Sequence, residues 1–183
     1  MTTTASASAT PVTTTTTSTT TTRPSLPVPT LDYVCSLDVS VSAPIDAGVL
    51  MGLGTAGRRR IIPITGGVVS GRLQGRVLPG GADFQRVPND TTADLDARYL
   101  IALEGEFAGE RIFVMNRALR RASPEDVARL LKGEAVDPAR VYFRCTPTFE
   151  VSTPRLQWLT ENIFVGTGAR APTGVKIEFY TIN

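Results

Sequence analysis

The chain has 183 residues, a formal net charge of +2 and no histidine. The absence of histidine excludes Ser-His-Asp and Cys-His nucleophile sites, and it removes the usual ligands of zinc and non-haem iron. There is also no Gly-x-Gly-x-x-Gly motif, phosphate-binding loop or Gly-x-Ser-x-Gly elbow. We therefore expect neither a metal nor a nucleotide cofactor.

The first 30 residues are almost entirely Thr, Ser, Ala and Pro, with Arg23 as the single charged residue. Such a segment cannot bury enough apolar surface to offset its ordering entropy, so we predict a disordered tail over residues 1–30. An O-glycosylated stalk has a similar composition, but the tail lacks the apolar core of a signal peptide. One arginine is too few for a transit peptide. We therefore expect a cytoplasmic protein.

Residues 31–183 amount to a single domain with enough chain to bury a sizeable core. Leu31–Ser42 alternates apolar and polar side chains, the period of a half-buried strand, until Pro44 and Gly48 interrupt it. No apolar run approaches the roughly 20 residues of a transmembrane helix, so we expect no membrane contact. Further short strands are expected at 59–64, 67–69, 72–78, 82–87, 95–104, 111–117, 141–146, 148–151, 163–165 and 175–182.

One helix is indicated after residue 123. Ser123 has the character of an N-cap, Pro124 suits the first helical position, and Gly133 would end the helix. A second helical turn is expected at 154–159. These short strands, with glycine-rich bends between them and one helix, favour an all-β protein, an antiparallel β-barrel. A barrel of that size can hold one small ligand.

Glycines recur throughout residues 66–84, where they predict bends or close approach of strands. The basic cluster at 58–60 has no aromatic residues between its arginines, so we expect a solvated turn and no nucleic-acid contact. The two cysteines, Cys35 and Cys145, lie in strand-like segments with no metal-ligand spacing. We predict that both are buried free thiols.

Proton transfer without histidine depends on carboxyl groups or tyrosine. Asp83 follows the turn at 79–81, where it could point inward or could accept hydrogen bonds from turn amides. Glu150 could act as a base if burial raises its pKa. These two carboxylates are the candidate acid–base residues.

Two further side chains could hold a negatively charged oxygen. Arg144 is a natural partner of a carboxylate, enolate or phenolate, although an arginine on the solvent face is equally consistent with the pattern. Tyr142 shares the face of Arg144 and is a candidate substrate contact. Asn116 ends the apolar face of its strand, either at a barrel mouth or at a solvent-exposed strand end.

The segment 95–101 places Asp96 and Arg98 on one strand face and Tyr99 on the other. Periodicity alone does not decide which face points into the barrel, so all three remain candidate substrate contacts. Phe84 and Trp158 could stack on a planar ligand. A lone tryptophan more often fills the end of a barrel.

Several ordered segments together resemble the all-β family known as domain of unknown function 3237, or uncharacterised protein family 0311. The resemblance implies a lipocalin-like barrel with a central cavity over residues 31–183. In this chain Phe84 replaces a usual Trp, Ala118 a usual Gly and Thr160 a usual Asn. The segments are GGVVSGRLQGRVLPGGADF (66–84), LDARYLI (95–101), Asn116-Arg117, VYFRCTPTFEV (141–151), LQWL (156–159) and FVGTGAR (164–170). The family's recurring positions correspond to Gly81, Asp83, Asp96, Arg98, Tyr99, Asn116, Arg144, Phe149, Glu150 and Trp158.

These observations favour a cofactor-independent enzyme that acts on a small carbonyl-bearing or phenolic metabolite by isomerisation, cyclisation or elimination. Asp83 or Glu150 would move the proton, and Arg144 and Asn116 would stabilise the oxyanion. The alternatives are a carrier barrel that binds a small molecule without turnover, and a structural barrel without a ligand. The oligomeric state stays open, with a homo-oligomer among the options.

Overall fold

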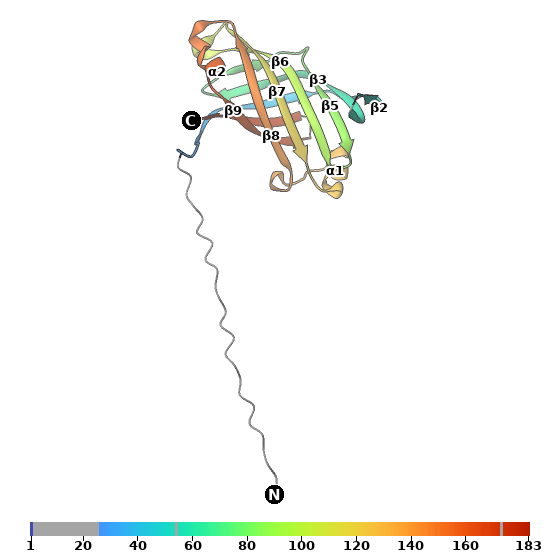
Figure 1. Cartoon of the computed structure of the whole chain (residues 1–183). Helices are drawn as coiled ribbons and strands as arrows, with labels where there is room; N and C mark the ends of the chain where they lie inside the picture. The colour runs from blue at the N-terminus through green and yellow to red at the C-terminus, as the bar shows by residue number, and fades with distance from the viewer. Residues whose placement is uncertain (2–25, 54, 173) are drawn as a thin grey trace.

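A computed structural model describes residues 1, 26–53, 55–172 and 174–183. The predicted tail falls largely on residues 2–25, which lie outside the described residues. In the described part, the strands form one antiparallel sheet that closes into an eight-stranded barrel (Figure 1). The predicted all-β antiparallel barrel with one short α-helix is therefore confirmed.

The barrel closes because its first strand pairs with both the last strand and the third. β1 pairs with β10 along most of its length, and residues Cys35–Val41 of β1 pair with Ile64–Gly71 of β3. Around the barrel the strands are β1 (Leu31–Val41), β10 (Gly174–Ile182), β9 (Phe164–Ala171), β8 (Tyr142–Val151), β7 (Arg111–Arg121), β6 (Thr92–Leu103), the pair β4 (Gly75–Val77) and β5 (Ala82–Asn89), and β3 (Thr55–Gly71).

The long strand β3 carries different partners along its two halves. β4 and β5 lie one after the other on one side of β3, so together they fill a single position in the barrel. On the other side, β2 (Ile45–Gly52) continues the line of β1 and pairs only with β3. The hairpin of β2 and β3 consequently projects beyond the closed barrel (Figure 1).

Two glycine-rich places differ from the prediction. The expected turn at Thr65-Gly66 is absent, because Gly66 and Gly67 continue β3 while the register with β1 shifts between Ser40 and Val41. The sequence does not predict β2, because Gly48 is expected to break the strand pattern there. Gly48 instead has φ +76° in a bulge, where the register with β3 shifts. Residues 58–60 lie within β3, so the predicted solvated turn is wrong.

One half of the barrel is filled with apolar side chains. Leu37, Ile101, Ile112 and Phe179 are each at most 1% exposed, and the free thiols of Cys35 and Cys145 are buried among them as predicted. This end is covered by two short helices, the 3-10 helix η3 (Pro154–Leu156) and α2 (Trp158–Glu161), whose Leu156 and Leu159 join the core. A further 3-10 helix, η1, spans Gly105–Phe107.

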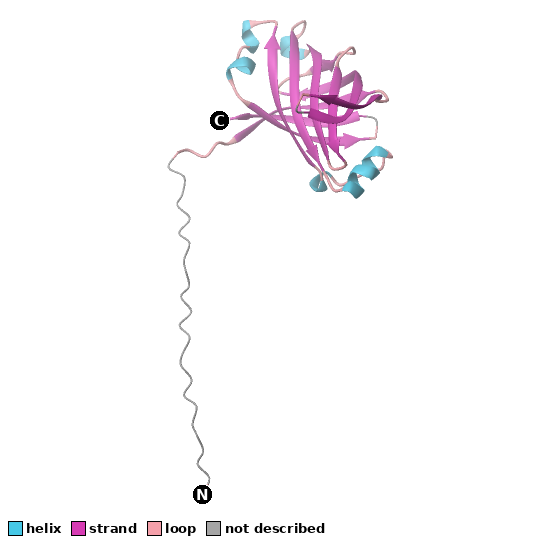
Figure 2. Cartoon of the chain, turned by 45° about the vertical axis from the view of Figure 1, so that its right-hand side comes forward, coloured by secondary structure: helices cyan, strands magenta, loops and turns pink. Residues whose placement is uncertain are grey.

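The remaining helices, α1 (Pro124–Leu131) and the 3-10 helix η2 (Pro138–Arg140), lie at the opposite end of the barrel (Figure 2). The backbone N–H of Asp126 donates to Ser123 Oγ at 3.1 Å, the N-cap that the sequence predicts. Arg140 forms an ion pair with the buried carboxylate of Asp126 at 3.0 Å. These contacts hold α1 beside the barrel mouth. Among the described residues, no helix combines the length and apolarity needed to cross a membrane.

Because β1 and β3 lie close together at Gly71, we predict that a side chain at this position strongly destabilises the fold. Gly71 has φ +121°, and an added Cβ would lie 2.7 Å from the carbonyl oxygen of Val34. Gly109 has φ +92° but no atom within 4 Å of such a Cβ. We expect Gly71→Ala to lower the free energy of unfolding by about 3 kcal/mol and Gly109→Ala by about 1 kcal/mol. Urea denaturation measures both, and equal losses would contradict the close approach.

Candidate functional site

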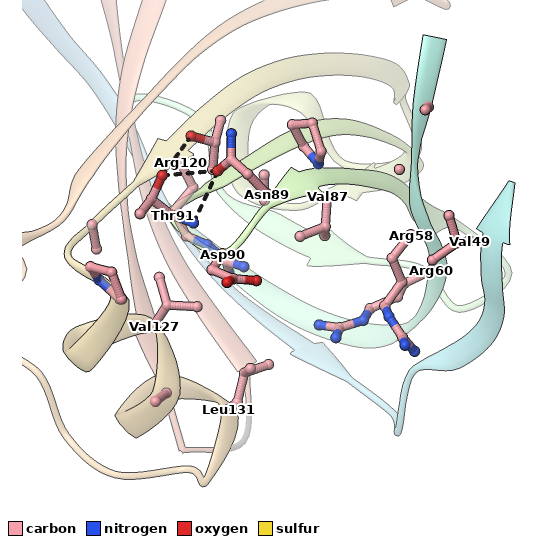
Figure 3. A pocket seen from close by; sticks show the side chains of 18 residues that line it. Val49, Arg58, Arg60, Val87, Asn89, Asp90, Thr91, Arg120, Val127 and Leu131 are labelled. Atoms are coloured by element: carbon pink, nitrogen blue, oxygen red, sulfur yellow. Dashed lines mark hydrogen bonds between the residues drawn. The ribbon is translucent and has the colours of Figure 1, made fainter. Parts of the chain in front are cut away.

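The open end of the barrel contains two hollows that share Arg120. The inner one, which we call the lumen, has a volume of about 60 Å³ and lies between the inward faces of the strands. The outer one, the groove, has a volume of about 630 Å³ and lies between α1 and the β2–β3 hairpin. Figure 3 shows Arg58 and Arg60 extending from β3 into the groove, opposite Val127 and Leu131 of α1. The polar side chains lining the lumen are Asp83, Gln85, Tyr99, Asn116, Arg120 and Arg170.

Strand alternation explains which side chains reach the lumen. On β7 the inward face runs through Ile112, Val114, Asn116, Ala118 and Arg120. Its first two residues belong to the packed core, and the last three line the lumen. The face thus changes from apolar to polar at the depth where the core ends.

Asp83 is the one carboxylate in the lumen lining. Gln85 Nε2 donates to Asp83 Oδ2 at 2.6 Å, and the backbone N–H of Asp96 donates to Asp83 Oδ1 at 3.1 Å. Burial raises the pKa of the Asp83 carboxyl, and this effect exceeds the lowering by the two donors and by the charge of Arg120. A carboxyl with a raised pKa is suited to proton transfer, because it both binds and releases a proton closer to neutral pH.

Two buried polar atoms in the lumen lack a partner. Tyr99 and Asn116 are 2% and 3% exposed, and neither Tyr99 Oη nor Asn116 Oδ1 has a hydrogen-bond partner among the described residues. Burial raises the pKa of the Tyr99 phenol well above its usual value, so Tyr99 stays a hydrogen-bond donor. Buried polar groups are normally paired, so this donor and this acceptor are free for a ligand group or a water molecule.

The mouth of the lumen is basic. Burial lowers the pKa of the Arg120 guanidinium, repulsion by Arg170 and Arg60 adds to this, and the charge of Asp83 opposes it. Arginine remains protonated through such shifts. Three guanidinium groups on β3, β7 and β9 thus converge where the lumen meets the groove.

The lumen contains three of the ten residues that the sequence singled out: Asp83, Tyr99 and Asn116. Most of the others alternate with inward positions and face outward. Arg98 forms an ion pair with the side chain of Asp96 at 3.1 Å on the outer face. Asp96 contributes to the lumen only through its backbone N–H, which donates to Asp83. The residues on the outer face are Phe84, Asp96, Arg98, Tyr142, Arg144 and Glu150.

Arg144 and Tyr142 line a separate, open depression on the outer face of the barrel, where Arg144 donates to Thr167 Oγ1 at 3.0 Å. Trp158, the first residue of α2, packs against the core, and the Arg72 guanidinium lies 3.9 Å from the centre of its ring. Trp158 therefore occupies the end-filling position that the sequence left as one alternative. The roles assigned to these outward side chains remain predictions.

Sequence reasoning missed Gln85, Arg120 and Arg170. Gln85 lies two residues after Asp83 and so shares its face. Arg120 and Arg170 were overlooked because their strands were predicted to end at residues 117 and 165, whereas β7 and β9 continue to Arg121 and Ala171. Extending the alternation from Asn116 and Phe164 would have placed both arginines on the inward face.

The cysteines are poor candidates for chemistry. Burial raises the pKa of Cys35 to about 12 and that of Cys145 to about 11, so both stay thiols near neutral pH. At Cys145 the side chain of Asn116 and the charge of Arg144 lower the pKa, but burial outweighs both. Among the residues that the structure describes, no three His, Cys, Asp or Glu side chains gather as a metal-binding group would require.

Comparison with known proteins relates this barrel to a family without assigned biochemistry. The family model described as "Protein of unknown function (DUF3237)" matches residues 29–182. The chain belongs to this family. A UPF0311 protein from Clostridium acetobutylicum is 40% identical over 146 residues, which cover 79% of this chain and 90% of that protein.

Solved structures share the fold. The crystal structure of a conserved protein of unknown function from Rhodopseudomonas palustris has a TM-score of 0.77 and 36% identity, and the match covers 86% of this chain and 100% of that one. The crystal structure of an enzyme from Penicillium herquei has a TM-score of 0.60 and 20% identity, covering 88% and 100% of the two chains. At that identity the similarity shows the fold alone.

The buried position of Asp83 predicts that its carboxyl group titrates at a higher pH than an exposed aspartate. We expect the ¹³Cγ resonance of Asp83 to report a pKa above the ordinary value of about 3.9. Because the folded-state pKa is raised, the contribution of Asp83 to stability is present below the unfolded-state pKa and is lost as the pH rises through the folded-state value.

Removal of the nearby positive charge in Arg120→Met should raise the pKa of Asp83 further. The control is Arg117→Met, which removes an arginine from the outward face of the same strand. An Asp83 pKa below the ordinary value, or equal shifts in the two variants, would contradict this description of the lumen.

Proposed function

We propose that this protein is a cofactor-independent acid–base enzyme that acts on a small carbonyl-bearing or phenolic metabolite, in an isomerisation, cyclisation or elimination. The observation that carries the proposal is Asp83, a carboxyl with a raised pKa in a lumen that also contains unpaired polar atoms. Perturbed carboxyls in enclosed pockets are characteristic of acid–base sites.

In this proposal Asp83 accepts a proton from a carbon next to a carbonyl, or from a phenolic oxygen. The bonding electrons then reside on the substrate oxygen as an enolate or phenolate. In an isomerisation the proton returns from Asp83 to a different atom of the substrate. In a cyclisation the enolate or phenolate attacks an electrophilic carbon of the same molecule, and the proton of Asp83 goes to the atom that receives the displaced electron pair. In an elimination the enolate expels a hydroxyl group from the next carbon, and this group takes the proton of Asp83 and leaves as water. No electron is gained or lost overall. The reaction therefore needs neither an oxidant nor a reductant.

The remaining lumen groups are placed to stabilise the developing charge. Tyr99 Oη can donate a hydrogen bond, and the Arg120 guanidinium supplies a positive charge at the lumen mouth. Donors that are fixed before the reaction, in a site poor in water, give the electrostatic stabilisation that contributes most to many enzymes. Asn116 has an unpaired acceptor that can orient a substrate hydroxyl or the phenol of Tyr99.

The two volumes restrict how a substrate sits. The lumen volume of about 60 Å³ is well below the usual range of small-molecule sites, so the lumen admits only a small functional group. The groove volume of about 630 Å³ lies within the usual range of small-molecule sites, so it accommodates the body of the substrate. We infer that the reacting group enters the lumen while the rest stays between α1 and the hairpin.

The fold shared with the Penicillium herquei enzyme is consistent with catalysis on this barrel, although fold similarity alone does not define a reaction. The same polar lumen would also suit a carrier that holds its ligand without turnover. Exchange of substrate protons distinguishes the two functions, because proton removal occurs only in the enzyme.

The predicted outcome is deuterium exchange that depends on Asp83. The full-length protein is incubated in D₂O with 2′-hydroxyacetophenone and with small 1,3-diketones, and deuterium incorporation is followed by NMR. We expect exchange above the buffer rate on at least one compound, and a loss of about 100-fold or more in Asp83→Asn. The matched control is Asp38→Asn on the outer face of β1, where the carboxylate lies 3.5 Å from Lys176 Nζ.

Glu150→Gln tests the other carboxylate that the sequence suggested, and its exposed position predicts unchanged exchange. If Asp83→Asn retains full activity, the assignment of Asp83 is overturned. Saturable binding of these compounds without exchange would instead favour the carrier.

A further inference from the structure

We propose that the natural ligand of this barrel is a carboxylate-bearing small molecule whose charged group binds among Arg60, Arg120 and Arg170, at the boundary between the groove and the lumen. This inference names the substrate class and rests on the proposed function only in using the same cavity. It requires binding, whether or not turnover follows.

The first argument is the lack of internal partners for these arginines. Among the described residues, none of Arg60, Arg120 and Arg170 forms an ion pair or a side-chain hydrogen bond with another residue. The neighbouring Arg58 differs, because it forms an ion pair with Asp46. Of the three, Arg120 has a guanidinium that the barrel removes from bulk water, which is costly without a partner, and a bound anion offsets that cost.

The second argument is the charge balance of the two hollows. Their lining contains four arginines, of which Arg58 is paired with Asp46, whereas Arg60, Arg120 and Arg170 have no such partner among the described residues; the lining has only two carboxylates, Asp83 and Asp90. Both oxygens of Asp83 already accept hydrogen bonds, from Gln85 and from the backbone of Asp96. Positive charges at the mouth of a cavity with a low dielectric constant create a strong positive potential there, and this potential attracts anions.

The third argument is the polar floor below the arginines. Tyr99 Oη and Asn116 Oδ1 offer a donor and an acceptor that no described residue uses. Asn116 lies four residues before Arg120 on β7, which corresponds to about 13 Å along the strand, a distance that the arginine side chain partly spans. A ligand with a carboxylate at the mouth and a hydroxyl or carbonyl group deeper in the lumen would pair both with the arginines and with Tyr99 or Asn116.

Carboxylate fits this site better than other anions. The planar fork of arginine pairs with carboxylate through two parallel hydrogen bonds, and apolar lining residues such as Val127 and Leu131 suit an organic body. The volume of the groove is larger than an inorganic ion needs. We therefore infer an organic acid of the size of a substituted benzoate.

Isothermal titration of the full-length protein compares benzoate and salicylate with their neutral analogues benzamide and salicylamide, at 20 and 200 mM salt. We expect at least one carboxylate to bind with one-to-one stoichiometry and at least 10-fold more tightly than its amide. Its affinity should fall at the higher salt concentration.

Arg120→Met and Arg170→Gln should each weaken carboxylate binding about 10-fold or more, the effect of losing one charge-assisted contact. Arg170 is exposed at the rim, so its variant reports on the site even if Arg120→Met does not fold. The matched control, Arg117→Met on the outward face of β7, should bind like the wild type.

Equal affinity for acid and amide, unchanged binding in both arginine variants, or no saturation by either carboxylate up to 10 mM would each overturn the inference. The outcome is separable from that of the exchange experiment. Carboxylate binding without proton exchange retains this inference and removes catalysis, whereas exchange on neutral ketones without preference for acids does the reverse.

Discussion

Charged groups inside a closed barrel cannot be hydrated as they are in bulk water, and this constraint governs the candidate site. The fold satisfies Asp83 with two donors, yet burial still raises the pKa of its carboxyl. Arg120 receives no such support from the described residues, and its guanidinium is further disfavoured by Arg170 and Arg60. The unfavourable free energy of burying these charges is offset by the packed half of the barrel, where apolar side chains exclude water.

The barrel could be predicted from the sequence because its strongest signals are local. The alternation in β1 and the N-cap of α1 specify their elements without reference to distant residues. Strand lengths were harder to predict, because glycine can end a strand, bend it or form a bulge. In β3 it bends the strand at Gly66 and Gly67, and in β2 it forms the bulge at Gly48. Only the facing strand decides between these outcomes.

The same ambiguity separates the candidate residues that reach the lumen from those that do not. Alternation divides a strand into two faces, but it identifies the inner face only when one side is clearly apolar. Phe143 and Cys145 gave that signal in β8, so the outward position of Arg144 and Tyr142 could have been inferred. For Asp83 the turn before β5 gave no such signal. The arginines at the mouth were hidden for a different reason, because charged residues at strand ends resemble the start of a loop.

The position of β2 has a consequence for the entry and release of ligands. β2 contributes Val49 to the groove wall, but the ring of hydrogen bonds that closes the barrel does not include it. Its other edge has no strand beside it among the described residues, and Met51 is 89% exposed. Peeling this segment away from β3 breaks one ladder and leaves the closed cylinder intact, so it is a low-energy opening compared with global unfolding. Substitutions in β2, which carries none of the three arginines at the mouth, would thus change the rate at which a molecule enters or leaves without removing the groups that recognise it.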